Sequence, residues 1–276
     1  MKFEGVDLEA LARREGTPLY VYSAAAIRDR LQGLQSALQG LDALVCYAVK
    51  ANSNQAILQL MADAGAGADI VSGGELLRSL RAGIPADRIV FSGVGKRADE
   101  IQQALPAADY VAEVRAALQG FEGRIVLEPG RYLVAEAGVL LTRALLTKHG
   151  EQRDFLVLDA AMNDLLRPSL YDAWHDIERI GDNAGRETIA YDVVGPVCET
   201  GDTFALARAL PRCEAGDLLA IRGAGAYGAS MGSTYNSRPL PAEVLVDGSR
   251  YAVVRRRQAF DEMIAGERPA TDWETP

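Results

Sequence analysis

Between residues 24 and 123, short apolar strands alternate with amphipathic helices, and few folds accommodate that order. Residues 43–49 (ALVCYAV) are all hydrophobic and predict a buried strand, and residues 55–64 (QAILQLMADA) then repeat hydrophobic side chains at helical spacing. This alternation predicts parallel strands joined by crossover helices. The predicted strands are 43–49, 68–71, 88–92 and 124–127, and the predicted helices are 55–64, 74–82, 98–105 and 110–118.

The texture of the chain changes after about residue 135, where short strand candidates are separated by turn residues. This pattern predicts an all-β region, and the segment 17–22 (TPLYVY) is expected to add an N-terminal strand to it. We therefore predict two domains, one formed by residues 24–135 and one formed by residues 1–23 and 136–276. The strands predicted for the second domain are 139–147, 154–158, 188–194, 217–221, 242–246 and 251–255.

Composition excludes several classes of function. The chain has 276 residues and a net charge of −9, and an acidic chain repels nucleic-acid phosphates. Its apolar runs are far shorter than the ~20 residues that a membrane span needs. The first residues carry no apolar signal region, so a cytoplasmic protein is expected. His149 and His175 have no partner at metal-ligand spacing, and the three cysteines are scattered, so no metal site is predicted.

Lys50 stands directly after the first predicted strand. In α/β folds this end of a strand is where ligands bind, and the amine of a lysine there could form a Schiff base if its neighbours favour the neutral form. A surface lysine that caps a strand is the alternative, and the position alone favours it.

The sequence Glu128-Pro129-Gly130-Arg131 follows the last predicted strand of the alternating region. Proline ends a strand, glycine lets the backbone approach a ligand, and arginine can bind an anion. The glutamate could pair with a protonated ring nitrogen. A turn with a surface ion pair explains the same four residues equally well.

Three further segments carry weaker signals. Cys198 and Glu199 lie among turn residues and could act as an acid–base pair, although a free cysteine is more often a small buried hydrophobe. Arg167 and Tyr171 are four residues apart, as on one face of a helix, and could bind a carboxylate or face solvent. Tyr227 belongs to a glycine-rich loop that lacks the P-loop pattern.

Together these segments resemble the diaminopimelate decarboxylase family, pyridoxal-phosphate enzymes of the alanine-racemase-like fold group. The resemblance extends from Thr17 to about Arg257. It rests on five motifs in the family's order: YAVKANSN at 47–54, EPGRYLV at 128–134, MNDLLRP at 162–168, CETGD at 198–202 and GAYG at 225–228.

The resemblance implies a role for each motif. Lys50 would bind pyridoxal 5'-phosphate covalently, and Glu128 would pair with the pyridinium nitrogen. Gly130, Arg131 and Tyr227 would lie near the cofactor and its phosphate. Cys198 would donate a proton after CO₂ leaves, from one subunit of a homodimer into the other's site. The residues implied to contact the substrate are Arg131, Arg167, Tyr171, Glu199 and Tyr227.

Length sets this chain apart from the family. An eight-stranded barrel takes ~250 residues, whereas residues 24–135 leave room for about four strands at ~30 residues per βαβ unit. The sequence therefore predicts a partial (β/α) barrel of about four parallel strands followed by an all-β domain. The segment that would carry the family's ring-stacking histidine and glycine-rich phosphate loop has no match here.

The resemblance predicts decarboxylation of meso-2,6-diaminopimelate to L-lysine. One alternative is a shortened member with impaired or no catalysis, which keeps weak cofactor binding or only subunit association. A second is a non-enzymatic role, in which the chain binds a full-length partner or two half-barrels complete each other by pairing their edges.

Overall fold

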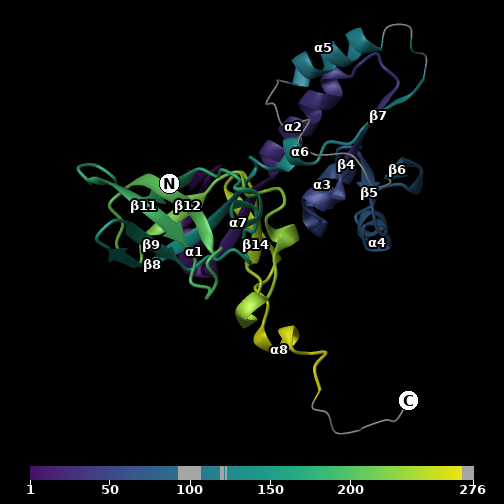
Figure 1. Cartoon of the computed structure of the whole chain (residues 1–276). Helices are drawn as coiled ribbons and strands as arrows, with labels where there is room; N and C mark the ends of the chain where they lie inside the picture. The colour runs from purple at the N-terminus through teal and green to yellow at the C-terminus, as the bar shows by residue number, and fades with distance from the viewer. Residues whose placement is uncertain (93–106, 119–120, 122, 269–276) are drawn as a thin grey trace.

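The computed structural model describes residues 1–92, 107–118, 121 and 123–268 of the chain. Its strands form a four-stranded sheet, a nine-stranded sheet and a small two-stranded hairpin (Figure 1). None of the helices in these residues is long and apolar enough to cross a membrane. The elements outside the two large sheets are β1 (Lys2–Phe3), β2 (Val6–Asp7), α1 (Leu8–Glu15), α6 (Arg131–Val134), α7 (Arg167–Tyr171) and α8 (Phe260–Met263).

The four-stranded sheet is parallel throughout and has the order β6-β5-β4-β7. This confirms the predicted partial barrel of about four parallel strands. The last strand, β7, lies beside the first, β4, as the last and first strands of a closed barrel do. The strands and their helices are α2 (Ala24–Ala37), β4 (Ala43–Ala48), α3 (Gln55–Asp63), β5 (Gly67–Ile70), α4 (Gly73–Arg81), β6 (Ile89–Phe91), α5 (Ala107–Ala117) and β7 (Ile125–Leu127).

Local sequence explains where these helices begin. The side chain of Asn54 accepts a hydrogen bond from the backbone of Ala56 at the start of α3, and Ser72 accepts one from Glu75 at the start of α4. Both residues satisfy backbone donors that a helix terminus leaves free. The helices and strands lie within two or three residues of the predicted bounds, and the predicted helix 98–105 lies outside the described residues.

The nine-stranded sheet confirms the predicted all-β region and its N-terminal strand, because β3 pairs with both β8 and β14. The long strand β8 pairs with β3 and β13 through its first half and with β9 through its second half. The strands of this sheet are β3 (Leu19–Ser23), β8 (Gly138–His149), β9 (Asp154–Leu158), β10 (Ile177–Ile180), β11 (Thr188–Val194), β12 (Thr203–Pro211), β13 (Leu218–Ile221), β14 (Ala242–Asp247) and β15 (Arg250–Arg255).

Two strands of this sheet, β10 and β12, were absent from the expectation. The sequence of β12, TFALARALP, is rich in helix-forming residues, and it becomes a strand by pairing with β11 over residues 203–211. The strand β10 has only four residues and pairs with β13. Pairing with strands remote in the sequence therefore gives β10 and β12 their extended conformation.

The two large sheets share one hydrophobic core. A single cluster of buried side chains contains Val45 and Ile57 of the parallel sheet and its helices together with Leu156 and Tyr191 of the nine-stranded sheet. The chain passes directly from β3 into α2 at Ser23, whose hydroxyl caps that helix. The division into domains at 23/24 and 135/136 stays a prediction.

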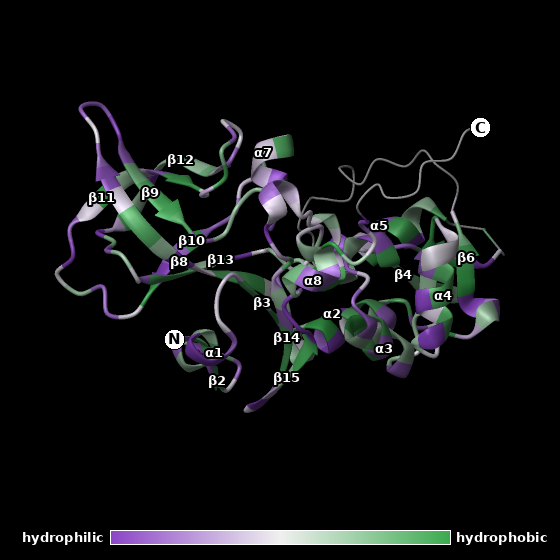
Figure 2. Ribbon diagram, turned by 90° about the horizontal axis from the view of Figure 1, so that it is seen from below, coloured by the Kyte–Doolittle hydropathy of each residue, from purple (hydrophilic) through white to green (hydrophobic). Residues whose placement is uncertain are grey.

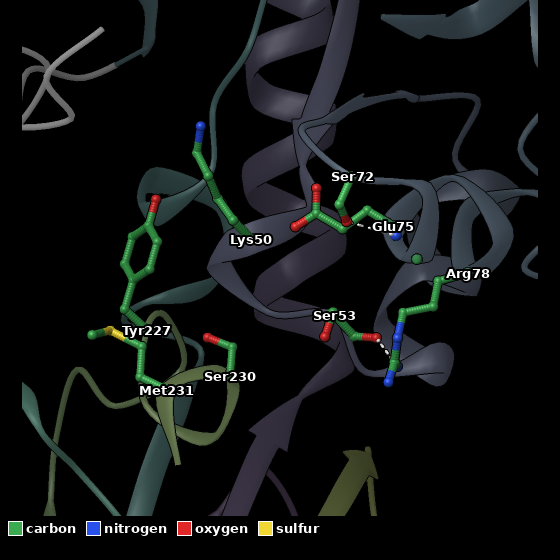
Figure 3. A pocket seen from close by; sticks show the side chains of 9 residues that line it. Lys50, Ser53, Ser72, Glu75, Arg78, Tyr227, Ser230 and Met231 are labelled. Carbon is green, nitrogen blue, oxygen red and sulfur yellow. Dashed lines mark hydrogen bonds between the residues drawn. The ribbon is translucent and has the colours of Figure 1, made fainter. Parts of the chain in front are cut away.

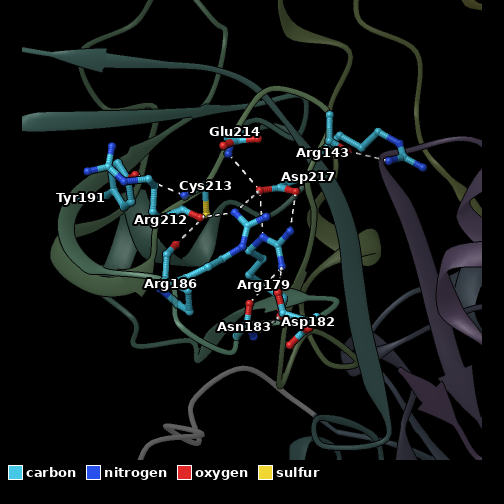
Figure 4. A network of polar contacts seen from close by, with 12 residues as sticks. Arg143, Arg179, Asp182, Asn183, Arg186, Tyr191, Arg212, Cys213, Glu214 and Asp217 are labelled. Carbon is cyan, nitrogen blue, oxygen red and sulfur yellow. Dashed lines mark hydrogen bonds and ion pairs between the residues drawn. The ribbon is translucent and has the colours of Figure 1, made fainter.

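An ion-pair network holds together the ends of β10 and β13 (Figure 4). Both side chains of its central pair, Arg179 and Asp217, are mostly buried, and the guanidinium donates two hydrogen bonds of 2.8 and 2.7 Å to the carboxylate. Arg186 lies 3.5 Å from the same carboxylate. Burial opposes the charge on Asp217, yet these arginine contacts hold its pKa below the ordinary value.

A buried carboxylate makes stability depend on pH. Burial raises the pKa of Asp164 from 3.8 to about 6, although its carboxylate accepts a 2.8 Å hydrogen bond from the Ala161 backbone. A raised carboxyl pKa means that the folded state binds the proton more tightly, so the contribution of Asp164 to stability falls as pH rises from about 4 through about 6 and then levels off. We expect the unfolding free energy of Asp164→Asn, relative to wild type, to rise by about 1 kcal/mol between pH 5 and 7.5. Urea titrations at the two pH values measure this, and a pH-independent difference would contradict it.

Candidate functional site

Lys50 lies at the carboxyl edge of the parallel sheet, on the short 3₁₀ turn Val49–Ala51 that follows β4. Val49 and Ala51 are fully buried, whereas the Lys50 side chain is 44% exposed. The buried side chains of Val49 and Ala51 thus anchor the turn, and the Lys50 side chain between them extends away from the core. Its Nζ atom lies 3.7 Å from a carboxylate oxygen of Asp69 on the neighbouring strand β5.

Asp69 is a site residue that the sequence reasoning missed. It is 2% exposed, it lies opposite Ala48 in the register of β4 and β5, and it accepts a hydrogen bond from Ser92. The sequence signal that could have identified Asp69 is a carboxylate inside the otherwise apolar strand 67–70. Buried carboxylates occur almost only with a charged or hydrogen-bonding partner. Asp69 gives the Lys50 ammonium a fixed, buried counter-charge.

The segment 128–131 packs against the lysine turn. The backbone of Ala48 donates to the Pro129 carbonyl oxygen at 3.1 Å, which aligns Glu128 at the end of β7 with Lys50 at the end of β4. A Cβ atom on Gly130 would lie 3.0 Å from the Cβ of Ala48 and 3.1 Å from that of Ala51. Glycine at this position therefore allows the close approach of the two segments, and a larger residue would crowd Ala48 and Ala51.

The glycine-rich loop of the nine-stranded sheet reaches the same turn. The backbone of Tyr227 donates to the Ala51 carbonyl oxygen at 2.8 Å, and the Asn52 side chain donates to the Gly225 carbonyl oxygen at 3.1 Å. Tyr227 has a φ of 54°, a left-handed conformation that is uncommon for a residue other than glycine. The loop thus carries the Tyr227 ring to the side of Lys50.

Lys50 and Tyr227 line a pocket of about 430 Å³ between the two sheets (Figure 3). Arg78 donates a 2.8 Å hydrogen bond to the Ser53 carbonyl oxygen, which ties α4 to the segment after Lys50. The sequence reasoning assigned no role to most of the lining residues, because they come from three segments that are separate in the sequence. The residues lining the pocket are Lys50, Ser53, Ser72, Gly74, Glu75, Arg78, Tyr227, Ser230 and Met231.

Two arginines flank Tyr227. The guanidinium carbon of Arg131 lies 4.8 Å from the centroid of the Tyr227 ring, and that of Arg167 lies 6.0 Å from it and 5.8 Å from the Tyr171 ring. Burial and then repulsion by Arg167 lower the pKa of Arg131, and burial lowers that of Arg167. The buried Nε atoms of both lack a hydrogen-bond partner among the described residues.

This arrangement is suited to binding an anion. Buried donors without partners are rare in folded proteins, and a carboxylate is the natural acceptor for a pair of guanidinium groups. The structure thus brings four predicted site residues, Arg131, Arg167, Tyr171 and Tyr227, into one cluster, and Tyr227 links it to the pocket that Lys50 lines.

His175 borders the arginine cluster. It is buried, and its Nδ1 lies 2.8 Å from the Arg222 carbonyl oxygen. Burial, followed by the charges of Arg167 and Arg131, lowers its pKa, although the Arg222 hydrogen bond opposes the shift. A neutral imidazole adds no positive charge beside the two arginines.

Cys198 and Glu199 lie elsewhere. Both are exposed, in the turn between β11 and β12, and neither lines the pocket. Buried Asp202 shapes this turn by accepting hydrogen bonds from the backbones of Met162 and Val197 at 2.6 and 2.8 Å. In the described part of the chain, no group of three or more His, Cys, Asp or Glu residues could hold a metal ion.

Comparisons with known proteins agree with this geometry. The family described as "Pyridoxal-dependent decarboxylase, C-terminal sheet domain" matches residues 19–225. The chain is 36% identical over 402 aligned residues to the diaminopimelate decarboxylase of Pseudomonas fluorescens, with 96% of each chain covered. The crystal structure of Helicobacter pylori diaminopimelate decarboxylase complexed with L-lysine superposes with a TM-score of 0.87 at 30% identity, covering 95% of this chain and 99% of that one.

The alignment also locates a difference in length. It spans 402 positions, whereas this chain has 276 residues, so at least 126 aligned positions have no counterpart here (402 − 276). The alignment still covers 96% of both chains, which places most of the difference inside the chain rather than at its ends. This agrees with a parallel sheet of four strands.

The tight packing around the lysine turn can be tested with matched glycine variants. We expect Gly130→Ala to lower the free energy of unfolding by about 1–3 kcal/mol, because the added methyl group overpacks the contact with Ala48 and Ala51. Gly33→Ala is the control, since no atom lies within 4 Å of its added Cβ and alanine favours the interior of α2. Urea unfolding should show a lower unfolding free energy for Gly130→Ala and a higher one for Gly33→Ala. Equal changes in the two variants would contradict the packing argument.

Proposed function

This chain belongs to the family of pyridoxal-dependent decarboxylases, and from that premise we propose that it converts meso-2,6-diaminopimelate to L-lysine and CO₂. The observation that carries the proposal is one cluster: a half-exposed lysine at a strand end lines a pocket together with Tyr227, and two half-buried arginines pack against the Tyr227 ring. We expect this activity in the cytoplasm.

The residues present fit pyridoxal phosphate. A pocket of about 430 Å³ lies within the usual range of small-ligand sites, and the Lys50 amine opens into it. Ser53, Ser72 and Ser230 line the same pocket and offer hydroxyl groups to a phosphate, and Glu128 is the proposed partner of the ring nitrogen. When bound, the cofactor supplies a conjugated ring that takes up the electron pair left by the departing CO₂.

The chain's own residues orient the substrate. Arg131 and Arg167 would bind a substrate carboxylate through their unused donors, and Tyr171 and Tyr227 would hold the two guanidinium groups in place. Asp69 keeps the Lys50 side chain directed along the sheet edge. A carboxylate fixed at one end of a substrate limits which of its bonds lies over the cofactor.

The proton that replaces CO₂ is proposed to come from outside this pocket. Cys198 and Glu199 are exposed and lie apart from Lys50 in the same chain, so we propose that they act on the site of a second subunit in a homodimer. In that arrangement Cys198 donates the proton that replaces CO₂, and Glu199 pairs with the distal ammonium group of the substrate.

The activity can be tested on the purified chain supplied with pyridoxal phosphate. We expect release of CO₂ and formation of lysine from meso-diaminopimelate, and their loss in Lys50→Ala. The control is Lys148→Ala, which removes an exposed lysine from β8. Turnover no greater than that of Lys50→Ala would overturn the proposal. A Lys50-dependent yellow absorbance without turnover would instead identify a shortened, cofactor-binding member without catalysis.

The carboxylate site makes a separate prediction. We expect Arg167→Gln to raise KM for diaminopimelate by about 10- to 100-fold, the cost of losing one charge-assisted hydrogen bond. Arg153→Gln serves as the control, because Arg153 is 64% exposed and its partner, Asp192, lies in β11. Steady-state kinetics of both variants measure the difference. Equal KM values for Arg167→Gln and Arg153→Gln would show that Arg167 does not bind the substrate.

A further inference from the structure

The parallel sheet ends in two free edges. In the described residues, β6 pairs only with β5 and β7 pairs only with β4. Ser92 donates its backbone N–H to Ile70 and Ile125 donates to Asp42, so the preceding Phe91 and the following Val126 direct theirs to the unpaired sides. Each edge therefore offers unused backbone donors and acceptors to a parallel strand.

Both edges expose apolar side chains. Phe91 on β6 is 67% exposed and Val126 on β7 is 40% exposed. Figure 2 shows β6 as a hydrophobic strand at the outer margin of the sheet. On the adjoining surface of α4, Leu77 and Leu80 are 68% and 44% exposed. Parallel strands are ordinarily buried on both faces, so this surface has the character of an interface.

The order and direction of the four strands indicate what kind of structure could pair with these edges. Each of the four strands is accompanied by one helix, all four strands run in the same direction, and β7 lies beside β4 as it would in a closed ring. The Pseudomonas fluorescens relative aligns over at least 126 positions that have no counterpart in this chain, and most of them lie inside the aligned region. Four such units are half of an eight-stranded barrel.

We propose that a second copy of this chain closes the barrel. A two-fold axis along the barrel would place β6 of each copy beside β7 of the other, so that both seams pair in parallel. The ring would then read β7-β4-β5-β6 twice and leave no edge in the parallel sheet. Such an interface is self-complementary and closed, because each copy contributes one edge of each kind.

A second copy satisfies constraints that another partner would not. Closure needs a partner with two free parallel edges, set at the curvature of the same barrel and carrying its own outer helices. β6 and β7 each have three residues, so the two edges also match in length. This seam is distinct from the contact proposed for Cys198 and Glu199, which lie in the nine-stranded sheet domain.

The experiment introduces a charged residue at each edge of the seam and measures self-association of the full chain without cofactor. Phe91→Lys alone and Val126→Glu alone should each weaken dimerisation by about tenfold or more, because a single charge is buried without a partner. Mixing the two variants should partly restore association, since their heterodimer gathers both substitutions at one seam and keeps native residues on both sides of the other. Leu206→Lys in β12 is the control, matched by its 65% exposure.

Sedimentation equilibrium gives the dissociation constants, and circular dichroism confirms that each variant is folded. A wild-type chain that stays monomeric in the micromolar range would overturn the proposal. So would a dimer that both edge variants leave intact, whatever the effect of Leu206→Lys. Because the readout is mass and not CO₂ release, failure here is separate from failure of the proposed activity.

Discussion

The site depends on one buried turn, Val49–Ala51, on which both large sheets converge. The Ala48 backbone bonds to Pro129 after β7, and the Ala51 carbonyl oxygen accepts from Tyr227 of the nine-stranded sheet. Gly130 allows the closest of these contacts. The flanking side chains of Val49 and Ala51 are fully buried, so the turn is held in place and presents the half-exposed Lys50 at the lining of the pocket. The position of the amine follows from packing on both sides.

The same convergence explains how the pocket persists with half the usual number of strands. Its walls are the segments that follow β4 and β5, the start of α4 and the loop that carries Tyr227. None of these walls includes the outer edges of β6 and β7. The shortened barrel therefore keeps Lys50, Asp69 and the arginine pair in place. The exposed apolar side chains lie on β6 and β7, the two outermost strands of the parallel sheet.

Much of this architecture could be predicted from residue order. The fully hydrophobic run before Lys50 and the helical spacing after it specified parallel strands, and the length of that region limited their number to about four. Prediction failed where pairing overrode local preference, as in the alanine- and leucine-rich β12. It also passed over Asp69, because a carboxylate in an apolar strand gains its meaning from the neighbouring strand that brings Lys50 within 3.7 Å.

The sequence by itself determined the fold class, the count of parallel strands and the identity of the chemical groups, because periodicity, length and motif order are local properties of the chain. Only the tertiary structure decided which of those groups meet. It gathered Arg131, Arg167 and Tyr171 with Tyr227, which lines the Lys50 pocket, and left Cys198 and Glu199 on an exposed turn outside that pocket. The reason is that strand order and register, which fix distances between remote residues, depend on non-local hydrogen bonds and on a shared core.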